Sequence, residues 1–567
     1  MSARRVVVGL ILGIHGGICL AQALPDSAAD LHRQELQLKQ LRQRNEALPD
    51  IRLQDAPTKV QGRLPEEVPC FPIKSVVFAG ASLALSELHQ ALAGPLRDDP
   101  PEGRCLGAQS IRLLLDRAQN ALIGQGYITS RVLALPQDIK GGELIFSIDP
   151  GRVGQVRQQD PETAVPADFA YLATQPGAVL DLRDIEQTLE NLRRNPNAAT
   201  DIEIRPGEIA GTSDIHIRYR LDKPWRLNLN LDDSGSKTTG KVQGNATLSW
   251  DNLLGMADIA YVSLGWGIWD RDPGPRGSRN AVLHYSMPLG YWLLSFTASR
   301  NRYHQTVPGA FQSYRYSGRS STSELQFTRV LRRGAGSKTS ASMKAFARAS
   351  NNYIDDTEVE VQRRRTGGWE AGFQHTHYLG HATLESQIQY RRGTGVFGSL
   401  RAPEETFGEG TSRMRLTLAS LSLLTPLAVG SMQWHYSGQL RAQWAGTPLT
   451  PQDRFCIGGR YTVRGFDGVQ NLCADQGQLL RNEISLPVGD YSLQVFGGID
   501  MGRVSGANSA YLVGKQLTGA VIGLRGAWQT GPHGALQYEL FVGKPLRRPQ
   551  GFETARTTAG FSLSLNF

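Results

Sequence analysis

The sequence is poor in cysteine, contains one long apolar run, and lacks nucleotide-binding and metal-binding motifs. Five cysteines occur among 567 residues, with no C-x-x-C pair and no histidine-rich partner pattern, which argues against a zinc site. A mean hydropathy of −0.31 excludes a bundle of membrane-spanning helices. No P-loop is present, so nothing indicates a nucleotide-driven reaction. We therefore expect neither a metal nor a cofactor, in a chain long enough for about two to four domains.

The one long apolar run stands at the beginning of the chain, from Val6 to Leu20. Arg4 and Arg5 precede it, and Ala21-Gln22-Ala23 follows it as a small-x-small cleavage site. A basic start, a short apolar run and such a site are typical of a secretory signal peptide rather than of a spanning helix. We expect residues 1–23 to be removed on export.

Export also bears on the cysteines and on the charge. Cys19 lies in the signal peptide, and an even number of remaining cysteines in an exported chain predicts disulfides. Three pairings are possible, and proximity in the sequence favours Cys70–Cys105 and Cys456–Cys473. The net charge of +9 suits a nucleic-acid partner in principle. Export and the scattering of the basic residues argue against one, so no nucleic acid is expected.

Residues 30–46 contain neither proline nor glycine and are rich in Leu, Gln, Arg and Glu, which predicts a helix with Asp30 at its N-cap. Three of its leucines, Leu31, Leu38 and Leu41, form only a thin apolar stripe. Because so narrow a stripe buries little in an apolar core, the helix is either free or lodged in a polar cavity. We assign residues 24–48 to this helical segment and the Pro- and charge-rich residues 49–69 to a linker.

Two modules of similar organisation follow, at 70–150 and 151–223, and each shows the order β-α-α-β-β. In the first module the predicted elements are Ile73–Phe78, Ala84–Leu96, Gln109–Gly124, Arg131–Leu135 and Glu143–Ile148. In the second they are Val153–Arg157, Pro166–Leu172, Leu182–Arg194, Ala199–Arg205 and Ser213–Leu221. Each module has an edge strand able to accept an extended peptide by strand addition. The alternative is that the modules are only spacers.

From 224 to 567 the helical period gives way to an alternation of apolar and polar residues. In one such segment Leu384, Ser386, Ile388 and Tyr390 alternate with Glu385, Gln387, Gln389 and Arg391. Roughly sixteen segments of about ten residues show this pattern, which is typical of a transmembrane β-barrel with an apolar outside and a polar inside. Short turns alternate with longer connections at 303–321, 350–366, 393–412 and 446–476. A soluble sandwich or propeller would not keep one polar face over so many strands.

The longest of these connections carries the motif Val463-Arg464-Gly465-Phe466, between Cys456 and Cys473. With it, the order of signal peptide, polar helix, linker, two modules and barrel resembles the outer-membrane transporters of two-partner secretion, of the haemolysin-activator type. In that family the modules are POTRA domains, and the sixth outer loop carries a VRG[YF] motif. Other matching motifs are Gly126-Tyr127-Ile128-Thr129-Ser130, Asn195-Pro196-Asn197, Pro206-Gly207, Asp232-Asp233-Ser234-Gly235, Trp250-Asp251-Asn252, Gly458-Gly459 and Arg481-Asn482-Glu483.

The resemblance covers essentially the whole mature chain and implies a sixteen-stranded barrel in the outer membrane of a Gram-negative bacterium, with the POTRA modules in the periplasm. It implies that the loop 446–476 folds back into the lumen and that Arg464 pairs with Asp500 of a D-x-G motif, Asp500-Met501-Gly502. A guanidinium offers a planar fork for a carboxylate, and Gly465 permits a turn closed to other residues. This role is conformational, and no catalytic residue is expected. One departure from the family pattern is Ile499, where Phe is expected.

The implied function is secretion of one large, unfolded exoprotein: a haemolysin, an adhesin or a contact-dependent toxin. The POTRA modules would bind it before it threads a monomeric, lipid-embedded barrel. An alternative is an assembly factor for barrel proteins, which shares the loop motif but usually has more modules and no plug helix. A barrel lipase would need a serine or carboxylate arrangement beside His375, His377 and His381, and none accompanies them. A plain porin would need neither modules nor a disulfide-closed loop.

Overall fold

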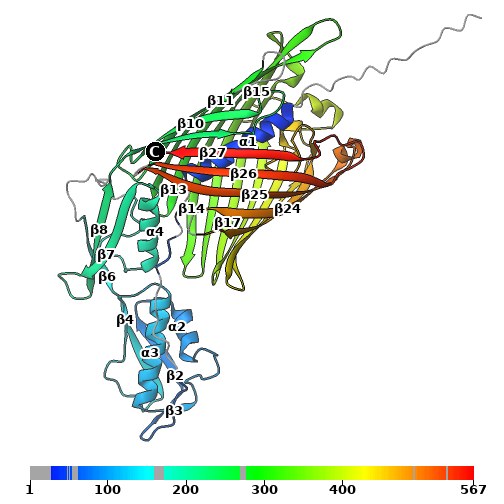
Figure 1. Ribbon diagram of the computed structural model, residues 1–567. Coiled ribbons are helices and arrows are strands. Elements are labelled where there is room, and N and C mark those ends of the chain that lie inside the picture. The colour runs from blue at the N-terminus through cyan, green and yellow to red at the C-terminus, as the bar shows by residue number, and fades with distance from the viewer. Residues whose placement is uncertain are drawn as a thin grey trace, which may run out of the picture.

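A closed barrel of antiparallel strands makes up the larger part of the structure, and two small α+β modules extend from one of its ends (Figure 1). The structure is a computed structural model, and it describes residues 27–46, 49, 51–53, 62–158, 171–268, 276–489, 492–531 and 534–567. The expected signal peptide, 1–23, lies outside the described residues, as does much of the linker. Helix α1 (Ser27–Asn45), blue in Figure 1, lies inside the barrel.

The barrel strands pair in the order of the sequence, and the last strand closes the ring on the first. They are β9 (Trp225–Asp232), β10 (Val242–Asp251), β11 (Ile259–Ile268), β12 (Gly277–Leu289), β13 (Trp292–Pro308), β14 (Ser313–Gly334), β15 (Ser337–Ile354), β17 (Arg364–Leu379), β18 (Ala382–Thr394), β19 (Arg415–Val429), β20 (Met432–Ala445), β23 (Gln476–Pro487), β24 (Gln494–Ser505), β25 (Gln516–Gly531), β26 (Gly534–Arg547) and β27 (Thr558–Asn566). The two-residue β16 (Thr357–Glu358) only extends the pairing at the end of β15. Within the described residues the ring therefore has sixteen strands, and the predicted barrel is confirmed.

Alternation along the strands gives the barrel two different surfaces. On β14, Leu325 and Phe327 are 40% and 46% exposed on the outside, whereas Glu324 lies in the lumen and contacts α1. Because lipid offers no hydrogen-bond partners, strands that cross it must pair all their backbone groups, and a closed ring does so. The inward-facing residues are then left to line a polar lumen.

Among the described residues, no helix is both long and apolar enough to span a membrane.

The first module packs two helices against a three-stranded sheet. In this sheet β2 (Ser75–Gly80) is parallel to β5 (Glu143–Asp149), and β4 (Arg131–Leu133) is antiparallel to it. Helix α3 (Ala108–Gly124) buries Leu114, Ala118 and Leu122, which share one helix face. Helix α2 (Leu85–Leu92) ends earlier than the predicted Leu96, because Gly94 adopts a left-handed φ of 80° and Pro95 follows it.

A disulfide closes the entrance to the first module. The short strands β1 (Phe71–Ile73) and β3 (Arg104–Leu106) pair with each other, and Cys70 is bonded to Cys105, with the Cα atoms 5.3 Å apart. The bond joins the incoming chain to the segment that leads into α3. Both disulfides favoured by proximity are present in the structure.

The second module consists of β6 (Arg152–Gln158), α4 (Leu182–Arg193), β7 (Ala198–Pro206) and β8 (Thr212–Leu221), with β6 parallel and β7 antiparallel to β8. Helix α4 begins after Asp181, whose carboxylate accepts a hydrogen bond from the backbone N–H of Arg183 and so caps the helix. The helix predicted at Pro166–Leu172 falls mostly outside the described residues, and its last two residues are not helical.

Helix α4 is buried between its own sheet and one end of the barrel. Arg333, at the end of β14, donates to Glu186 at 3.2 Å and to Glu190 at 2.8 Å. The same guanidinium donates to the backbone carbonyl of Ile51 at 2.9 Å, and the N–H of Leu53 donates to Glu186 at 2.8 Å. The linker residues 51–53 are therefore held between α4 and the barrel.

The turn between β12 and β13 forms a second contact with α4. The Asn191 side chain donates to the backbone carbonyl of Gly290 at 2.8 Å, and the Tyr291 hydroxyl donates to Asp184. Burial raises the pKa of Asp184 to about 6, although the hydrogen bond from Tyr291 acts in the opposite direction. The second module is thus fixed to the barrel by polar contacts that are themselves buried.

Three boundary predictions are wrong. Helix α1 begins at Ser27, so Asp30 lies in its first turn, where acidic residues are also favoured, and not at the N-cap. The connection expected at 303–321 is only residues 309–312, because β13 and β14 stay paired as far as Pro308 and Ser313. Strand pairing likewise occupies part of 350–366. Polar alternation continues past the point where a strand leaves the lipid, so it does not mark the end of the strand.

Candidate functional site: a helix and a loop inside the barrel

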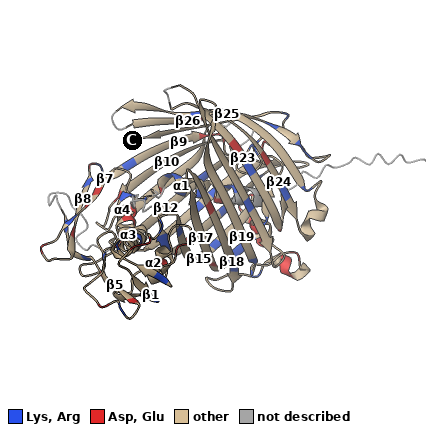
Figure 2. Cartoon of the chain, turned by 90° about the horizontal axis from the view of Figure 1, so that it is seen from below, with Lys and Arg blue, Asp and Glu red and all other residues tan. Residues whose placement is uncertain are grey.

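Helix α1 occupies the barrel lumen, and the strands around it carry both basic and acidic residues (Figure 2). At about 1.5 Å per residue, its 19 residues extend about 28 Å, close to the ~30 Å thickness of a hydrocarbon core. A helix of this length nearly crosses the membrane inside the barrel.

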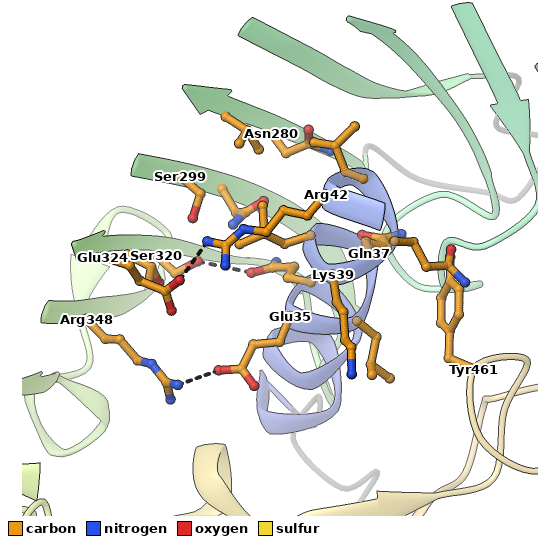
Figure 3. A pocket seen from close by; sticks show the side chains of 18 of the residues that line it. Glu35, Gln37, Lys39, Arg42, Asn280, Ser299, Ser320, Glu324, Arg348 and Tyr461 are labelled. Carbon is orange, nitrogen blue, oxygen red and sulfur yellow. Dashed lines mark hydrogen bonds and ion pairs between the residues drawn. The ribbon is translucent and has the colours of Figure 1, made fainter. Parts of the chain in front are cut away.

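Two ion pairs hold α1 to β14 and β15, one from the middle of the helix and one from its last turn (Figure 3). Arg42 Nη2 lies 2.6 Å from Glu324 Oε2, and Glu35 Oε1 lies 2.8 Å from Arg348 Nη2. Other polar side chains of the helix hydrogen-bond to the wall, in the pairs Gln34–Ser320, Gln37–Ser234 and Arg44–Asn230. The scarcity of apolar residues on this helix therefore matches a polar cavity, one of the two surroundings that its sequence allows.

Near its C-terminal end, α1 combines an apolar contact with a buried polar cluster. The apolar contact joins Leu38 and Leu41 to Ile259, Tyr261 and Val282. The Tyr261 hydroxyl donates to Glu46 Oε1 at 3.1 Å, and His284 Nε2 lies 3.1 Å from the same oxygen. The His284 ring, 1% exposed, stacks on Tyr261. This end of the helix is the one that leads into the linker held by α4.

The second element in the lumen is the connection between β20 and β23, residues 446–475, which we call the lumen loop. Its base is a hairpin of β21 (Phe455–Ile457) and β22 (Leu472–Ala474), in which Cys456 stands opposite Cys473 and is bonded to it, with the Cα atoms 4.1 Å apart. The 3-10 turn Pro451–Asp453 of the loop lies beside α1. Tyr461 of the loop extends toward Gln37 of the helix (Figure 3). Helix and loop thus share the lumen.

Arg464, within the lumen loop, reaches two carboxylates of the barrel wall. Its Nε and Nη2 atoms donate to the two carboxylate oxygens of Asp500 at 2.7 and 2.8 Å, and its backbone N–H donates to Oδ2 at 2.9 Å. Its Nη1 atom donates to Glu483, which also accepts from Arg525 at 2.6 Å. Arg464 is 6% exposed and Asp500 is 0% exposed. The structure therefore brings Arg464 and Asp500 together and adds a second acid, Glu483.

The lumen loop supplies the guanidinium in close contact with Asp500, whereas Arg481 of the wall is more distant, with its Nε 3.8 Å from Oδ2. A bidentate contact between guanidinium and carboxylate is selective in geometry. Burial removes both groups from water, and this cost offsets much of their attraction, so the pair adds little net stability. Loss of one partner leaves the other charge buried and costs about 3–5 kcal/mol. The pair therefore fixes the position of the loop more than it stabilises the barrel.

Gly465 brings the loop backbone against the inner face of β25 and β26. Its φ is 98°, and a Cβ atom there would lie 2.6 Å from the carbonyl oxygen of Lys544. On the strand side, a Cβ atom at Gly519 would lie 1.9 Å from the carbonyl oxygen of Arg464. Two glycines thus allow a backbone-to-backbone approach that no other residue permits.

Val463 and Phe466, the two apolar residues of the motif, are both buried. Val463 packs over Gly502 of β24, where an added Cβ atom would lie 2.8 Å from the valine side chain. Phe466 meets Phe552 edge to face, with ring centroids 5.8 Å apart. They belong to an apolar cluster with Phe455, Ile457, Leu472, Ala474, Leu479, Val504 and Leu517. All six motif residues singled out in the sequence therefore meet at one place, whereas Cys70 and Cys105 lie in the first module.

Glu483 is a contact of Arg464 that the sequence did not predict, although it belongs to the motif Arg481-Asn482-Glu483. Arg481 stands opposite Asp500 in the register of β23 and β24, and side chains two residues apart face the same side of a strand. Glu483 therefore faces the same side of β23 as Arg481. This placement follows from the register of the two strands, which is known only once they are paired. Ile499 faces outward and is 51% exposed, so packing inside the lumen does not need an aromatic residue there.

The histidines considered for a hydrolytic site lie on the barrel wall. The rings of His375 and His377 are stacked 5.9 Å apart, and His375 Nδ1 is 2.8 Å from the Thr339 hydroxyl. In the part of the chain that the structure describes, no group of three or more His, Cys, Asp or Glu residues is placed to hold a metal ion.

Two cavities lie beside the helix and the loop. One cavity of about 430 Å³ lies around α1, and another of about 480 Å³ lies beside Arg44, Tyr461 and Arg464. An extended chain needs about nine residues to cross a ~30 Å core at ~3.3 Å per residue. Helix α1 and the lumen loop both lie in the lumen that such a segment would cross.

Comparison with known families places these features in a recognised group. A family model described as haemolysin secretion/activation protein ShlB/FhaC/HecB matches residues 211–526. A model of the POTRA domain of ShlB type matches residues 71–151, and a second POTRA model matches residues 152–206.

Individual relatives match along most of the chain. The outer membrane transporter CdiB-2 of Burkholderia pseudomallei (strain 1026b) is 34% identical over 95% of this chain and 94% of that protein. The hemolysin transporter protein ShlB of Serratia marcescens is 26% identical over 77% of this chain and 76% of that protein. Among solved structures, CdiB from Acinetobacter baumannii has a TM-score of 0.82 and 31% identity, covering 96% of this chain and 99% of that one.

Deletion of residues 30–46 is expected to raise the conductance of the purified protein in a planar bilayer severalfold, because the helix nearly spans the lumen and displaces water from it. A matched control is the double variant Glu35→Gln, Arg42→Gln, which keeps the helix but weakens two ion pairs. It should show brief openings between long closed periods. Equal conductance of the deletion variant and the unaltered protein would show that the helix does not obstruct the pore.

Proposed function

This chain belongs to the haemolysin secretion/activation family of two-partner secretion transporters, and we propose that its cargo crosses the outer membrane through the lumen when α1 leaves it. The protein is an outer-membrane transporter of a partner exoprotein and not an enzyme. The cargo we propose is one large, unfolded exoprotein. Ring closure by β27 on β9 occurs within one chain, which supports a monomeric pore.

The observation that carries this proposal is the difference between the anchors of the helix and of the loop. Helix α1 is held mostly by hydrogen bonds and ion pairs to a polar wall, such as Arg42–Glu324 and Gln37–Ser234. Water entering the lumen replaces such contacts most easily where they are exposed: the Glu35 side chain, paired with Arg348, is 46% exposed, and exposed ion pairs contribute only about 0–1 kcal/mol. A disulfide closes the loop on itself, and an apolar cluster and the buried Arg464–Asp500 pair hold it to the barrel wall. The helix is therefore the element that yields, and the loop holds its place.

An assembly factor for barrel proteins is the main alternative. The match to the haemolysin secretion/activation model and the presence of two POTRA matches, with α1 in the lumen, favour export.

Removal of the gene from its natural host tests the function directly. We expect one large protein to disappear from the medium and from the cell surface, as measured by quantitative proteomics, and to return when the gene is restored. The abundance of other outer-membrane barrels serves as the control and should not change. A general decline of those barrels, with no single exoprotein lost, would contradict export and support the assembly factor.

We further propose that the Val463–Phe466 motif keeps the loop in the position that secretion needs. Arg464→Ala is expected to reduce secretion at least tenfold, because loss of the bidentate contact costs about 3 kcal/mol, leaves Asp500 with only the more distant Arg481, and frees the loop. The barrel should still insert, as judged by heat-modifiable mobility on gels. Arg464→Lys is the matched control: it restores the charge but not the bidentate fork, and should recover only part of the secretion. Normal secretion by Arg464→Ala would show that secretion does not need Arg464 to keep the loop in position.

The POTRA modules are proposed to bind the cargo by strand addition, and β2 is the edge we assign. Among the described residues β2 pairs only with β5, so its other edge is open. Beside that edge, Val77 and Ile145 stand opposite each other and are 40% and 39% exposed. The edge of β6, by contrast, is partly covered, since the N–H of Val153 donates to the carbonyl of Ala178. An open edge next to apolar side chains suits an extended peptide.

A photo-crosslinking amino acid at Val77 is expected to trap the cargo during secretion, because an added strand would lie against this side chain. The same amino acid at Arg112, on the exposed side of α3, is the matched control and should trap little. Crosslinked products are measured by immunoblot against the exoprotein. Stronger trapping at Arg112 than at Val77 would place the cargo on the helical face instead.

A further inference from the structure

Four arginines form a patch on the outer wall of the barrel. In the strand register, Arg279 of β12 is opposite Arg302 of β13, and Arg302 is opposite Arg319 of β14. Arg300 lies two residues away from Arg302 on the same face of β13, and all four side chains are exposed. Neighbouring strands are ~4.8 Å apart, so these guanidinium groups share a small area, which we call the arginine patch.

The arginine patch stands at the outer end of an apolar belt. Along β13, the outward positions that precede the patch are Trp292, Leu294, Phe296 and Ala298. Trp292 adjoins the turn that contacts α4, so it marks the periplasmic end of the strand. About ten residues separate it from Arg302, and at ~3.3 Å per residue and a tilt of ~40° they rise about 25 Å, the height of the apolar band of such barrels. The patch therefore lies at the level of the headgroups of the outer leaflet.

The four charges of the arginine patch have no acidic partner in the part of the chain that the structure describes. Within the described residues no carboxylate forms an ion pair with any of the four, and Arg319 instead lies 5.3 Å from the ring centroid of Tyr353. In the lumen, by contrast, arginines such as Arg391 and Arg464 are paired with acids. Like charges directly opposite each other in neighbouring strands are unfavourable. This arrangement points to an anion supplied from outside the chain.

We propose that the arginine patch binds the phosphate groups of a phosphorylated glycolipid in the outer leaflet. A guanidinium accepts a phosphate in a bidentate contact. Four to six residues from the patch along the same face of these strands, Leu283, Phe296 and Leu325 are 48%, 38% and 40% exposed, so a molecule with an anionic head and acyl chains contacts both surfaces at once. A soluble anion would use only the arginines. The lipid then holds the β12–β14 wall at a fixed height in the membrane.

The test compares two lipids on the full-length protein purified in detergent. Lipid A carrying both phosphates and its dephosphorylated form are added separately, and bound lipid is counted by native mass spectrometry. The phosphorylated form is expected to remain bound severalfold more often. The double variant Arg302→Ser, Arg319→Ser should lose most of this binding. The matched control Arg329→Ser, Arg332→Ser removes two exposed arginines from the opposite end of β14 and should keep it.

Three outcomes would overturn the proposal. Equal retention of the two lipids by the unaltered protein would show that phosphate is not recognised, and this comparison needs no variant. Equal retention of lipid A by the two double variants would show that the lipid binds elsewhere, provided that heat-modifiable mobility shows both barrels to be folded. Displacement of lipid A by the same concentration of phosphatidylglycerol or inorganic phosphate would show a general anion site and not a glycolipid site.

Discussion

A strand that crosses lipid obtains its hydrogen bonds only from neighbouring strands, and the rest of this structure depends on that constraint. It requires a closed ring, and the ring turns every second side chain toward an enclosed lumen. Apolar packing, which organises the two POTRA modules, is therefore scarce around α1. What occupies the lumen is positioned by paired charges and hydrogen bonds. The specificity of the interior is thus electrostatic, while its exterior is apolar.

The lumen contains two kinds of anchor, and the difference between them has a physical origin. The lumen loop builds a small apolar core of its own against β24 and β25, closed by Cys456–Cys473, beside which the Arg464 charge is buried. Helix α1 has no comparable core, and many of its partners line the cavity around it. The contacts of the lumen loop break together, whereas the contacts of α1 exchange one by one. This difference supports the proposal that α1 moves while the loop keeps its place.

The sequence was sufficient for the architecture because the relevant signals are periodic. The dyad of apolar and polar residues predicts the barrel, and the narrow leucine stripe on 30–46 predicts a helix that is either free or lodged in a polar cavity. Contacts between distant segments were not predictable in this way: nothing local links Arg42 to Glu324 or Arg333 to Glu190. The extension of β13 and β14 beyond their predicted ends was also not predictable, since a strand outside the lipid does not need an apolar residue at every second position. Motif resemblance supplied Arg464 and Asp500, but the third member, Glu483, became evident only from strand pairing.

The linker residues 51–53, held between α4 and the barrel, have a consequence for the resting state of the pore. They lie only a few residues beyond the end of α1. A helix displaced from the lumen is then still tied to the mouth of the barrel, and its return is an intramolecular event. For a short tether the effective concentration is of the order of millimolar. If α1 leaves the lumen as proposed, the connectivity of the chain therefore favours its return after transport.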